Sequence, residues 1–549
     1  MGARASPPRT RVLAHGTRDI DAMLHTLDVG ELRAFLKEGL AGLEPDVRRR
    51  LEDALEHRAV TRGGFRPAAP SAAIVDGAAE LARAAKHVGY AEPSEVDHYL
   101  RSAITASLAG EHAAARMIFE ALLVPIANAD IDLGQHEMVD EVLTVDLDDC
   151  VARYMLATFM EAKVSGRAEA VLAALERTQG LGCLVAPLEA MERALGRPLP
   201  DAEAFLDAWI ARLETRTRAD SEWDNEEDRW LREAIGRRHG AEGLAHLART
   251  TKRAEVARAW CDAVVAEGDW NRALDAYEEA ATIVTSPVWR GEFLDGAALA
   301  AKRLEHKRSS AKLEAAWLGA PSLARLLRWL LADDAPRALV RKRAKQAIEA
   351  CPKDGARLRG LLHLLLGQRE LAARALAAAP GLGWSSDDHP GHVVFPSFAW
   401  VLSEGKPAHA AATCVDALRE APHSLIDISF EGLHLPHETP AVEKLATPTV
   451  LDALARAEAS SGITPSQRNV ILDAMRAAAR KRVDGVTGEK RRRHYGHAAR
   501  LVACCVEFER GADATAWLTE IRARTSRFPA FREELAGALG VFDPRSRAR

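Results

Sequence analysis

Apolar residues recur three and four positions apart in long stretches of the chain, which is the spacing of amphipathic helices. Clear examples are residues 24–43, 45–60, 93–110 and 200–216. Several of these stretches begin at a Ser or Asp, or directly after a Pro, as helix starts commonly do. The pattern predicts a chain made of helices.

A second pattern returns along the chain, in which a Gly is followed by a small residue at offset five, a larger residue at offset nine and a third packing residue at offset twelve. These are the offsets of the second helix of a tetratricopeptide-like hairpin, where Gly ends one helix and the small residue lets the paired helices approach. The four copies are Gly110, Ala115, Phe119 and Leu122; Gly268, Ala273, Tyr277 and Ala280; Gly367, Ala372, Leu376 and Ala379; and Gly405, Ala410, Cys414 and Ala417.

A degenerate fifth copy lacks the Gly and has His306, Ala311, Ala315 and Leu318 at these offsets. A Pro follows four of the five copies, at Pro125, Pro321, Pro380 and Pro422, and is expected to stop the second helix. Because the intervals between copies are irregular, we predict an all-α, divergent TPR-like helical-hairpin solenoid with insertions.

Clusters of Gly, Pro and Ser are expected to form loops or joints between modules. They fall at residues 62–74, 381–396, 421–449 and 483–489. The expected organisation is an N-terminal helical segment, a helical repeat region, TPR-like hairpins, a hairpin with loop insertions and a C-terminal helical pair, at residues 1–61, 62–245, 246–380, 381–480 and 481–549.

The amino-acid composition favours helices and limits the classes of binding partner that we expect. Ala and Leu dominate the 48% of apolar residues, whereas aromatic residues make up only 5%. The net charge of -5 provides no overall attraction to nucleic acid or acidic membranes. The seven cysteines are scattered without CxxC pairs, as reduced core thiols are. With no long uncharged apolar stretch, we expect a cytoplasmic protein without a membrane partner.

The strongest candidate for a metal site is the loop at Asp387, Asp388, His389 and His392, together with His434 and His437. Imidazole and carboxylate groups could hold Zn²⁺ if the two loops meet. The competing interpretation is that His389 and His392 cap turns. The acidic stretch 130–141 invites a Ca²⁺ interpretation, but Gly134 occupies a ligand position, so we interpret this stretch as the acidic start of a helix.

A basic segment near the C-terminus could bind a polyanion such as nucleic acid. It spans Arg476 to Arg500 and contains Arg480, Lys481, Arg482, Lys490, Arg491, Arg492 and Arg493. The alternative is that Arg476 and Arg480 complement the dipole at a helix end and that the run at Arg491 is a solvated loop.

Two regions resemble the helical portion that accompanies SWIM zinc fingers in bacterial proteins. Residues 28–185 are similar in the lead-in LRAFLKEGLAGLEPDVRRRL and in the acidic loop ANADIDLGQHEMVDEV. Residues 490–535 are similar to the C-terminal helical pair, which implies packing roles for Tyr495, Ala498, Ala499, Leu501, Trp517, Leu518, Ile521 and Arg522. The Cys-x-Cys and Cys-x-His pairs of the zinc finger are absent, so the resemblance implies helical repeats and protein interaction only.

No nucleophile elbow, phosphate-binding loop, dinucleotide fingerprint or kinase signature occurs in the sequence. We therefore expect a non-enzymatic scaffold or adaptor that binds a protein partner and needs no cofactor. Two alternatives stay open: a nucleic-acid-associated regulator that uses residues 476–500, and a divergent metal-dependent enzyme.

Overall fold

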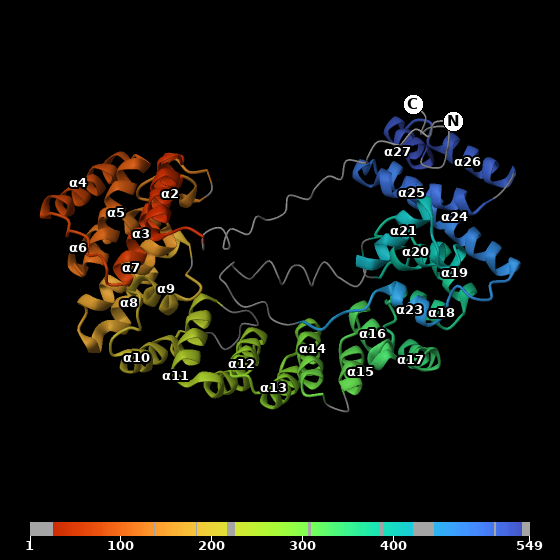
Figure 1. Cartoon of the computed structure of the whole chain (residues 1–549), viewed down its shortest axis with the longest axis horizontal. Helices are drawn as coiled ribbons and strands as arrows, with labels where there is room; N and C mark the ends of the chain where they lie inside the picture. The colour runs from red at the N-terminus through yellow and green to blue at the C-terminus, as the bar shows by residue number, and fades with distance from the viewer. Residues whose placement is uncertain are drawn as a thin grey trace. The chain divides into compact units, whose positions relative to one another are not determined.

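The computed structural model describes residues 26–136, 138–182, 184–216, 225–305, 309–384, 386, 388–420, 444–509 and 512–540. Within these ranges the regular structure consists of twenty-five α-helices and five short 3₁₀ turns, without a strand (Figure 1). A single isolated bridge joins Tyr90 and Asp132. The prediction of an all-α protein is confirmed. Among the described helices, none combines the length and the apolar character needed to cross a membrane.

The chain forms two compact units, Met1–Gly240 and Ala241–Arg549. The boundary falls inside α11 (Glu226–Thr251), where Gly240 leaves the helical conformation with φ 59° and ψ -152°. Glycine tolerates a positive φ because it has no Cβ. Residue 240 therefore divides α11 into two helical pieces, one in each unit.

In the first unit, the helices from α5 to α8 each pack against the next, while α4 packs mainly on α6, α9 on α7 and α10 on α8. Buried Ala, Leu and Val side chains on one face of each helix supply this contact, as amphipathic patterning predicts. Its helices are α2 (Val29–Ala41), α3 (Pro45–Thr61), α4 (Ala72–Val88), α5 (Pro93–Ala109), α6 (His112–Ala127), α7 (Leu147–Glu161), α8 (Arg167–Thr178), α9 (Pro187–Leu195) and α10 (Ala202–Glu214).

The second unit begins as a row of sequentially packed helices, from α12 to α16. These helices are α12 (Ala254–Ala266), α13 (Trp270–Ile283), α14 (Pro287–Arg303), α15 (Ser309–Gly319) and α16 (Leu323–Leu330). Asp269 caps the start of α13 by accepting hydrogen bonds from the backbone N–H groups of Asn271 and Arg272. This row is the part of the chain that most resembles a linear array.

In the rest of the second unit, helices that are not consecutive in the sequence pack together. Helix α19 packs on α24, α21 on α25 and α25 on α27. One hydrophobic core extends from Trp317 to Leu535. The helices are α17 (Arg337–Ala350), α18 (Ala356–Leu365), α19 (Arg369–Ala378), α20 (Gly391–Leu402), α21 (His409–Glu420), α23 (Val450–Arg456), α24 (Pro465–Gly488), α25 (Tyr495–Phe508), α26 (Ala512–Arg524) and α27 (Pro529–Gly540).

The residues of the repeat pattern lie at helix junctions. Gly110, Gly268, Gly367 and Gly405 have left-handed φ values between +77° and +81° and follow α5, α12, α18 and α20. Ala115, Ala273, Ala372 and Ala410 are buried in the following helices, as is Phe119. Tyr277 is half-buried, and its ring lies so close to Gly296 of α14 that a Cβ there would clash with it.

The degenerate fifth copy does not pack as expected. His306 lies outside the described residues, while Ala311, Ala315 and Leu318 are exposed on α15. Ala316 and Trp317 are buried instead, so the contact face of α15 is displaced by one position. The large Trp317 side chain buries more apolar area than the small residues at the expected positions, which explains the displaced face.

Several expected breaks are helical. Residues 483–488 continue α24 without interruption, and residues 391–396 form the start of α20. Pro396 is tolerated inside α20, and Pro125 lies inside α6 two residues before its end. Neither Pro lies in the first turn of its helix, so each removes one backbone hydrogen bond without ending the helix, and the Gly and Pro content misled the prediction. Most of 421–449, including Pro422, lies outside the described residues.

Candidate interaction surfaces

The basic segment divides into paired and unpaired cations. On α24, Arg480 pairs with Glu520 of α26 at 3.0 Å, and Arg476 pairs with Glu509 and, at 3.6 Å, with Asp473. Both arginines lie in the middle of α24, so the expectation that they complement a helix end is wrong. Their charges are balanced by carboxylates across the helix packing.

Lys481 fastens the end of α19 to α24. Its Nζ donates to the carbonyl oxygens of Ala377, Ala378 and Ala379, at 2.8, 3.3 and 3.3 Å. These carbonyls end a helix and have no partner within it, and a cation there also complements the helix dipole. The ammonium group of Lys481 is therefore used in contacts within the fold.

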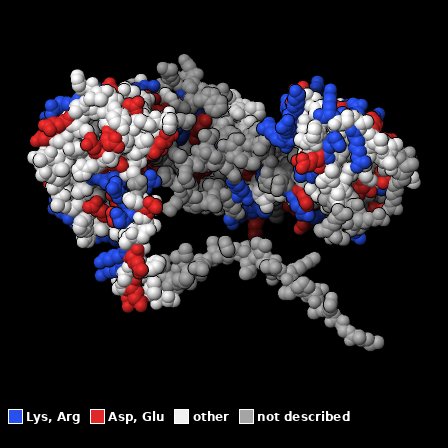
Figure 2. Space-filling model, turned by 90° about the horizontal axis from the view of Figure 1, so that it is seen from above, with Lys and Arg blue, Asp and Glu red and all other residues white. Residues whose placement is uncertain are grey.

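The run Lys490, Arg491, Arg492 and Arg493 is exposed where α24 ends and the 3₁₀ turn Arg492–His494 begins. Within the described residues, none of these four cations makes an ion pair; Arg493 Nε lies 3.2 Å from His494 Nε2. In Figure 2, Lys and Arg side chains gather over the part of the molecule that holds the C-terminal helices, at the right of the view. This run is a concentrated patch of unneutralised positive charge.

Arg482 differs from its neighbours because it is buried. Only 5% of the residue is exposed, and its Nη1 donates to Gly381 O at 3.3 Å. Its guanidinium carbon lies 5.9 Å from the ring centroid of Trp384, whose ring centroid is 5.2 Å from that of His389 and 5.2 Å from that of His497. We call Trp384, Arg482 and His497 the tryptophan cluster.

Positive charge dominates the surroundings of this cluster. Burial, and then Arg491, lower the pKa of Arg482. The pKa of His497 falls to about 3, first because of burial and then because of Arg482, Arg500, His392 and His494. Burial and then Arg482, Arg493 and Arg491 also lower the pKa of His494. Among the described residues, every charged neighbour that shifts the pKa of these three groups is a cation or a histidine.

In the loop proposed as a metal site from the sequence, His389 makes hydrogen bonds to the backbone. Its Nε2 lies 2.8 Å from Pro380 O, and its Nδ1 accepts from the backbone N–H of Gly391 at 3.0 Å. This is the turn-capping role considered from the sequence. The described residues contain no group of three or more His, Cys, Asp or Glu side chains able to hold a metal ion. Asp387, His434 and His437 lie outside the described residues.

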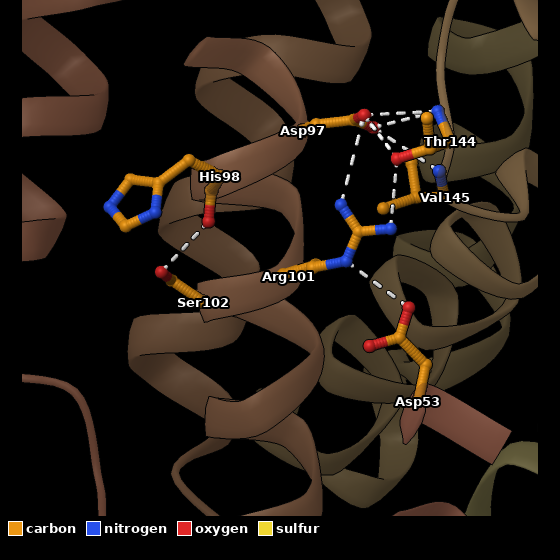
Figure 3. Close-up of polar contacts among 7 residues, drawn as sticks. All are labelled: Asp53, Asp97, His98, Arg101, Ser102, Thr144 and Val145. Carbon is orange, nitrogen blue, oxygen red and sulfur yellow. Dashed lines mark hydrogen bonds and ion pairs between the residues drawn. The ribbon is translucent and has the colours of Figure 1, made fainter. Parts of the chain in front are cut away.

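The acidic stretch in the first unit forms a loop that is attached to α5, and only one 3₁₀ turn, Val139–Glu141, where a helix start was expected. The buried Asp97 of α5 accepts from the backbone N–H of Thr144 at 3.0 Å and of Val145 at 3.2 Å, and from the Thr144 hydroxyl (Figure 3). Arg101 lies 3.7 Å from Asp97 and donates to Asp53 of α3 at 3.1 Å and to Thr144 at 2.9 Å. The network braces α3, α5 and the loop.

The α2–α3 hairpin has an unusual apolar surface. Helix α2 has no buried residue, and Phe35 is 65% exposed. On α3, exposed apolar side chains repeat every four residues at Val47, Leu51 and Leu55. We define the apolar face as Val29, Phe35, Leu36, Leu43, Val47, Leu51 and Leu55. The spacing was visible in the sequence, but nothing in it distinguished an exposed row from a packed one.

A cleft of about 460 Å³ lies among α21, α25 and α27. Its polar lining residues are Thr413, Arg500, Glu533 and Glu534, so it carries both signs of charge. Cys504 and Cys505 of α25 are buried, and burial raises the pKa of both thiols. This agrees with core thiols and offers no thiolate for chemistry at neutral pH.

Comparison with known proteins adds no family. No protein-family model matches the sequence, and no curated protein matches it significantly. The packing positions implied by the SWIM-associated resemblance are buried at Tyr495, Ala498, Ala499, Leu501, Trp517 and Ile521, whereas Leu518 is half-buried and Arg522 is exposed.

Proposed function

We propose that this chain is a non-enzymatic helical-repeat scaffold that binds a partner protein, and that the apolar face of α2–α3 is the contact surface. The proposal includes a divergent solenoid of TPR-like hairpins and a relation to the helical portion of SWIM-associated proteins. The observation that carries it is the exposure of Val47, Leu51 and Leu55 on α3 and of Phe35 and Leu36 on α2. Contiguous exposed apolar patches usually mark interaction sites.

The expected occupant is an amphipathic helix with acidic flanks. Two adjacent helices with apolar rows present a groove that a third helix can fill through residues spaced three and four apart. Arg49 and Arg50 are exposed beside the row and make no ion pair within the described residues, while Arg48 pairs with Glu52 at 3.8 Å. Carboxylates on the partner would complement these arginines and favour one orientation.

Site-specific photocrosslinking tests this proposal. A photoreactive residue at Leu51 in the full chain should capture a partner helix in the native cell, and the same residue at Leu318, which is 54% exposed on α15, should not. The double variant Leu51→Glu and Leu55→Glu should then abolish binding of the purified partner, with Leu318→Glu as the matched control. Adducts confined to copies of this chain, or equal capture at both positions, would overturn the proposal.

A second candidate is binding of nucleic acid at Lys490–Arg493, favoured by the four adjacent unpaired cations. Binding that neutralises these charges must weaken steeply with salt. Affinity for DNA and RNA should fall when all four are changed to Gln and should be retained when Arg48, Arg49 and Arg50 are changed instead. No binding at low salt would remove this candidate. The metal-dependent enzyme stays a hypothesis without a supporting observation.

A further inference from the structure

The second unit contains a buried arginine, Arg482, that has no counter-ion among the described residues. Arg482 makes no ion pair within the described residues, and its Nε is buried without a hydrogen-bond partner. Buried charges in folded proteins are normally paired and hydrogen-bonded, because removing a charge from water is costly. Contact with the Trp384 ring offsets part of that cost but does not neutralise the charge.

Unused hydrogen-bonding atoms occur in the neighbouring side chains of the same cluster. Trp384 Nε1, which can only donate, is buried without a partner, and so is His497 Nδ1. A buried donor left without an acceptor costs about 1 to 3 kcal/mol. Three buried nitrogens without a hydrogen-bond partner, on Trp384, Arg482 and His497, therefore belong to one group of side chains.

Contacts among α19, α24, α25 and the loop that carries Trp384 hold these side chains in place. The Lys481 contacts with α19 and the Arg482 contact with Gly381 fix the loop that carries Trp384 against α24. Gly381 approaches so closely that a Cβ there would lie 2.0 Å from Lys481 O. His497 comes from the first turn of α25. The cluster is thus positioned without any carboxylate among its described contacts.

We propose that the tryptophan cluster is a binding site for a phosphate group, with Arg482 as its principal ligand and Trp384 and His497 as hydrogen-bonding partners. The planar guanidinium of arginine matches the oxygens of phosphate, and a dianion would neutralise the surplus positive charge that surrounds Arg482. The exposed cations Arg491 and Arg493, which act electrostatically on His494 beside the cluster, would draw an anion towards it.

This inference depends neither on the apolar face nor on nucleic-acid binding, because a single phosphate group is the ligand. The phosphate could be free or part of a phosphorylated molecule. Inorganic phosphate and phosphoserine are therefore both used as probes, with serine as the uncharged control. A longer polyanion that binds while both small probes fail would assign the cations to the second candidate function and overturn the phosphate site.

Calorimetric titration of the full chain with inorganic phosphate, at constant ionic strength against chloride, tests the site directly. We expect one saturable site whose affinity falls at least about tenfold in Arg482→Met. Arg480→Met is the matched control, since Arg480 lies on the same helix but pairs with Glu520, and its affinity should stay within about twofold. Equal affinity in the two variants would overturn the assignment.

Two further variants keep the test decisive. Trp384→Phe keeps an aromatic ring at this position but removes the Nε1 donor together with part of the indole, so it should weaken phosphate binding even if Arg482→Met does not fold. Asp387, which lies outside the described residues, is changed to Asn. If phosphate binds to Asp387→Asn and not to the natural protein, the counter-ion is internal and the proposal fails.

Discussion

Two buried charges, one in each unit, have opposite surroundings. In the first, the carboxylate of Asp97, 3% exposed, accepts backbone and hydroxyl hydrogen bonds from the loop and lies beside Arg101. In the second, the guanidinium of Arg482, 5% exposed, makes one hydrogen bond to a carbonyl oxygen and has no carboxylate among the described residues. The satisfied charge of Asp97 is a structural brace, whereas the unpaired charge of Arg482 is the one for which we propose a ligand.

The largest expected effect is at Asp97. Asp97→Ala should lower the free energy of local unfolding by about 3 to 5 kcal/mol, because it leaves the backbone N–H groups of Thr144 and Val145 without their acceptor and removes the carboxylate beside Arg101. Hydrogen exchange of the segment around Thr144 measures this loss. Asp53→Ala removes the half-buried carboxylate on the same arginine and should cost about 1 kcal/mol. If the two variants lose equal stability, Asp97 is not the centre of the brace.

Glu233 extends the comparison to a buried acid in the first unit. It accepts hydrogen bonds from the backbone N–H groups of Leu188 and Glu189, at 3.1 and 2.7 Å, and lies 3.3 Å from Arg237. Burial nevertheless raises its pKa from 4.5 to about 7. The native state then holds the proton more tightly than the unfolded chain. Its stabilising contribution is complete below pH 4.5 and is lost as pH rises through 7.

Glu233→Gln should remove this pH dependence. The natural protein should lose up to about 3 kcal/mol of stability in the first unit between pH 4.5 and 8, whereas the variant should change little. Urea unfolding at a series of pH values, combined with hydrogen exchange of α9, provides the measurement. An unchanged slope in the variant would place the titrating group elsewhere.

His497 should give the opposite slope in the second unit. Its pKa is about 3 in the fold and 6.5 in the free side chain, so the unfolded state binds the proton more tightly. The contribution of His497 is complete above pH 6.5 and is lost as pH falls towards 3. His497→Leu should reduce the acid loss of stability by about 2 kcal/mol relative to His494→Leu, measured by urea unfolding at pH 4.5 and 7.5. If His497→Leu and His494→Leu lose the same stability between pH 7.5 and 4.5, this prediction is wrong.

The sequence predicted helices well and their environments poorly. Helix positions follow from local spacing, so the amphipathic stretches that became α2, α3, α5 and α10 could be recognised. Whether a residue is paired depends on contacts far along the chain. Asp97 meets Thr144 across 47 positions, and nothing in the sequence near Trp384 marks its contact with His497. Within the basic run, Arg482 could not be distinguished from the exposed Arg491, because charge alone does not show burial.

The smallest expected change in stability is that of Arg482→Met, and it best tests the contrast between Asp97 and Arg482. In phosphate-free buffer, Arg482→Met should alter the free energy of unfolding of the second unit by less than about 1 kcal/mol, because an unpaired buried charge is replaced by an apolar side chain of similar length. With phosphate at about a hundred times its dissociation constant, the natural protein should gain about 2.7 kcal/mol and the variant almost nothing. Denaturant unfolding with and without phosphate measures both differences. A loss of 3 kcal/mol or more in phosphate-free buffer would make Arg482 a brace like Asp97, and the distinction between the two units would disappear.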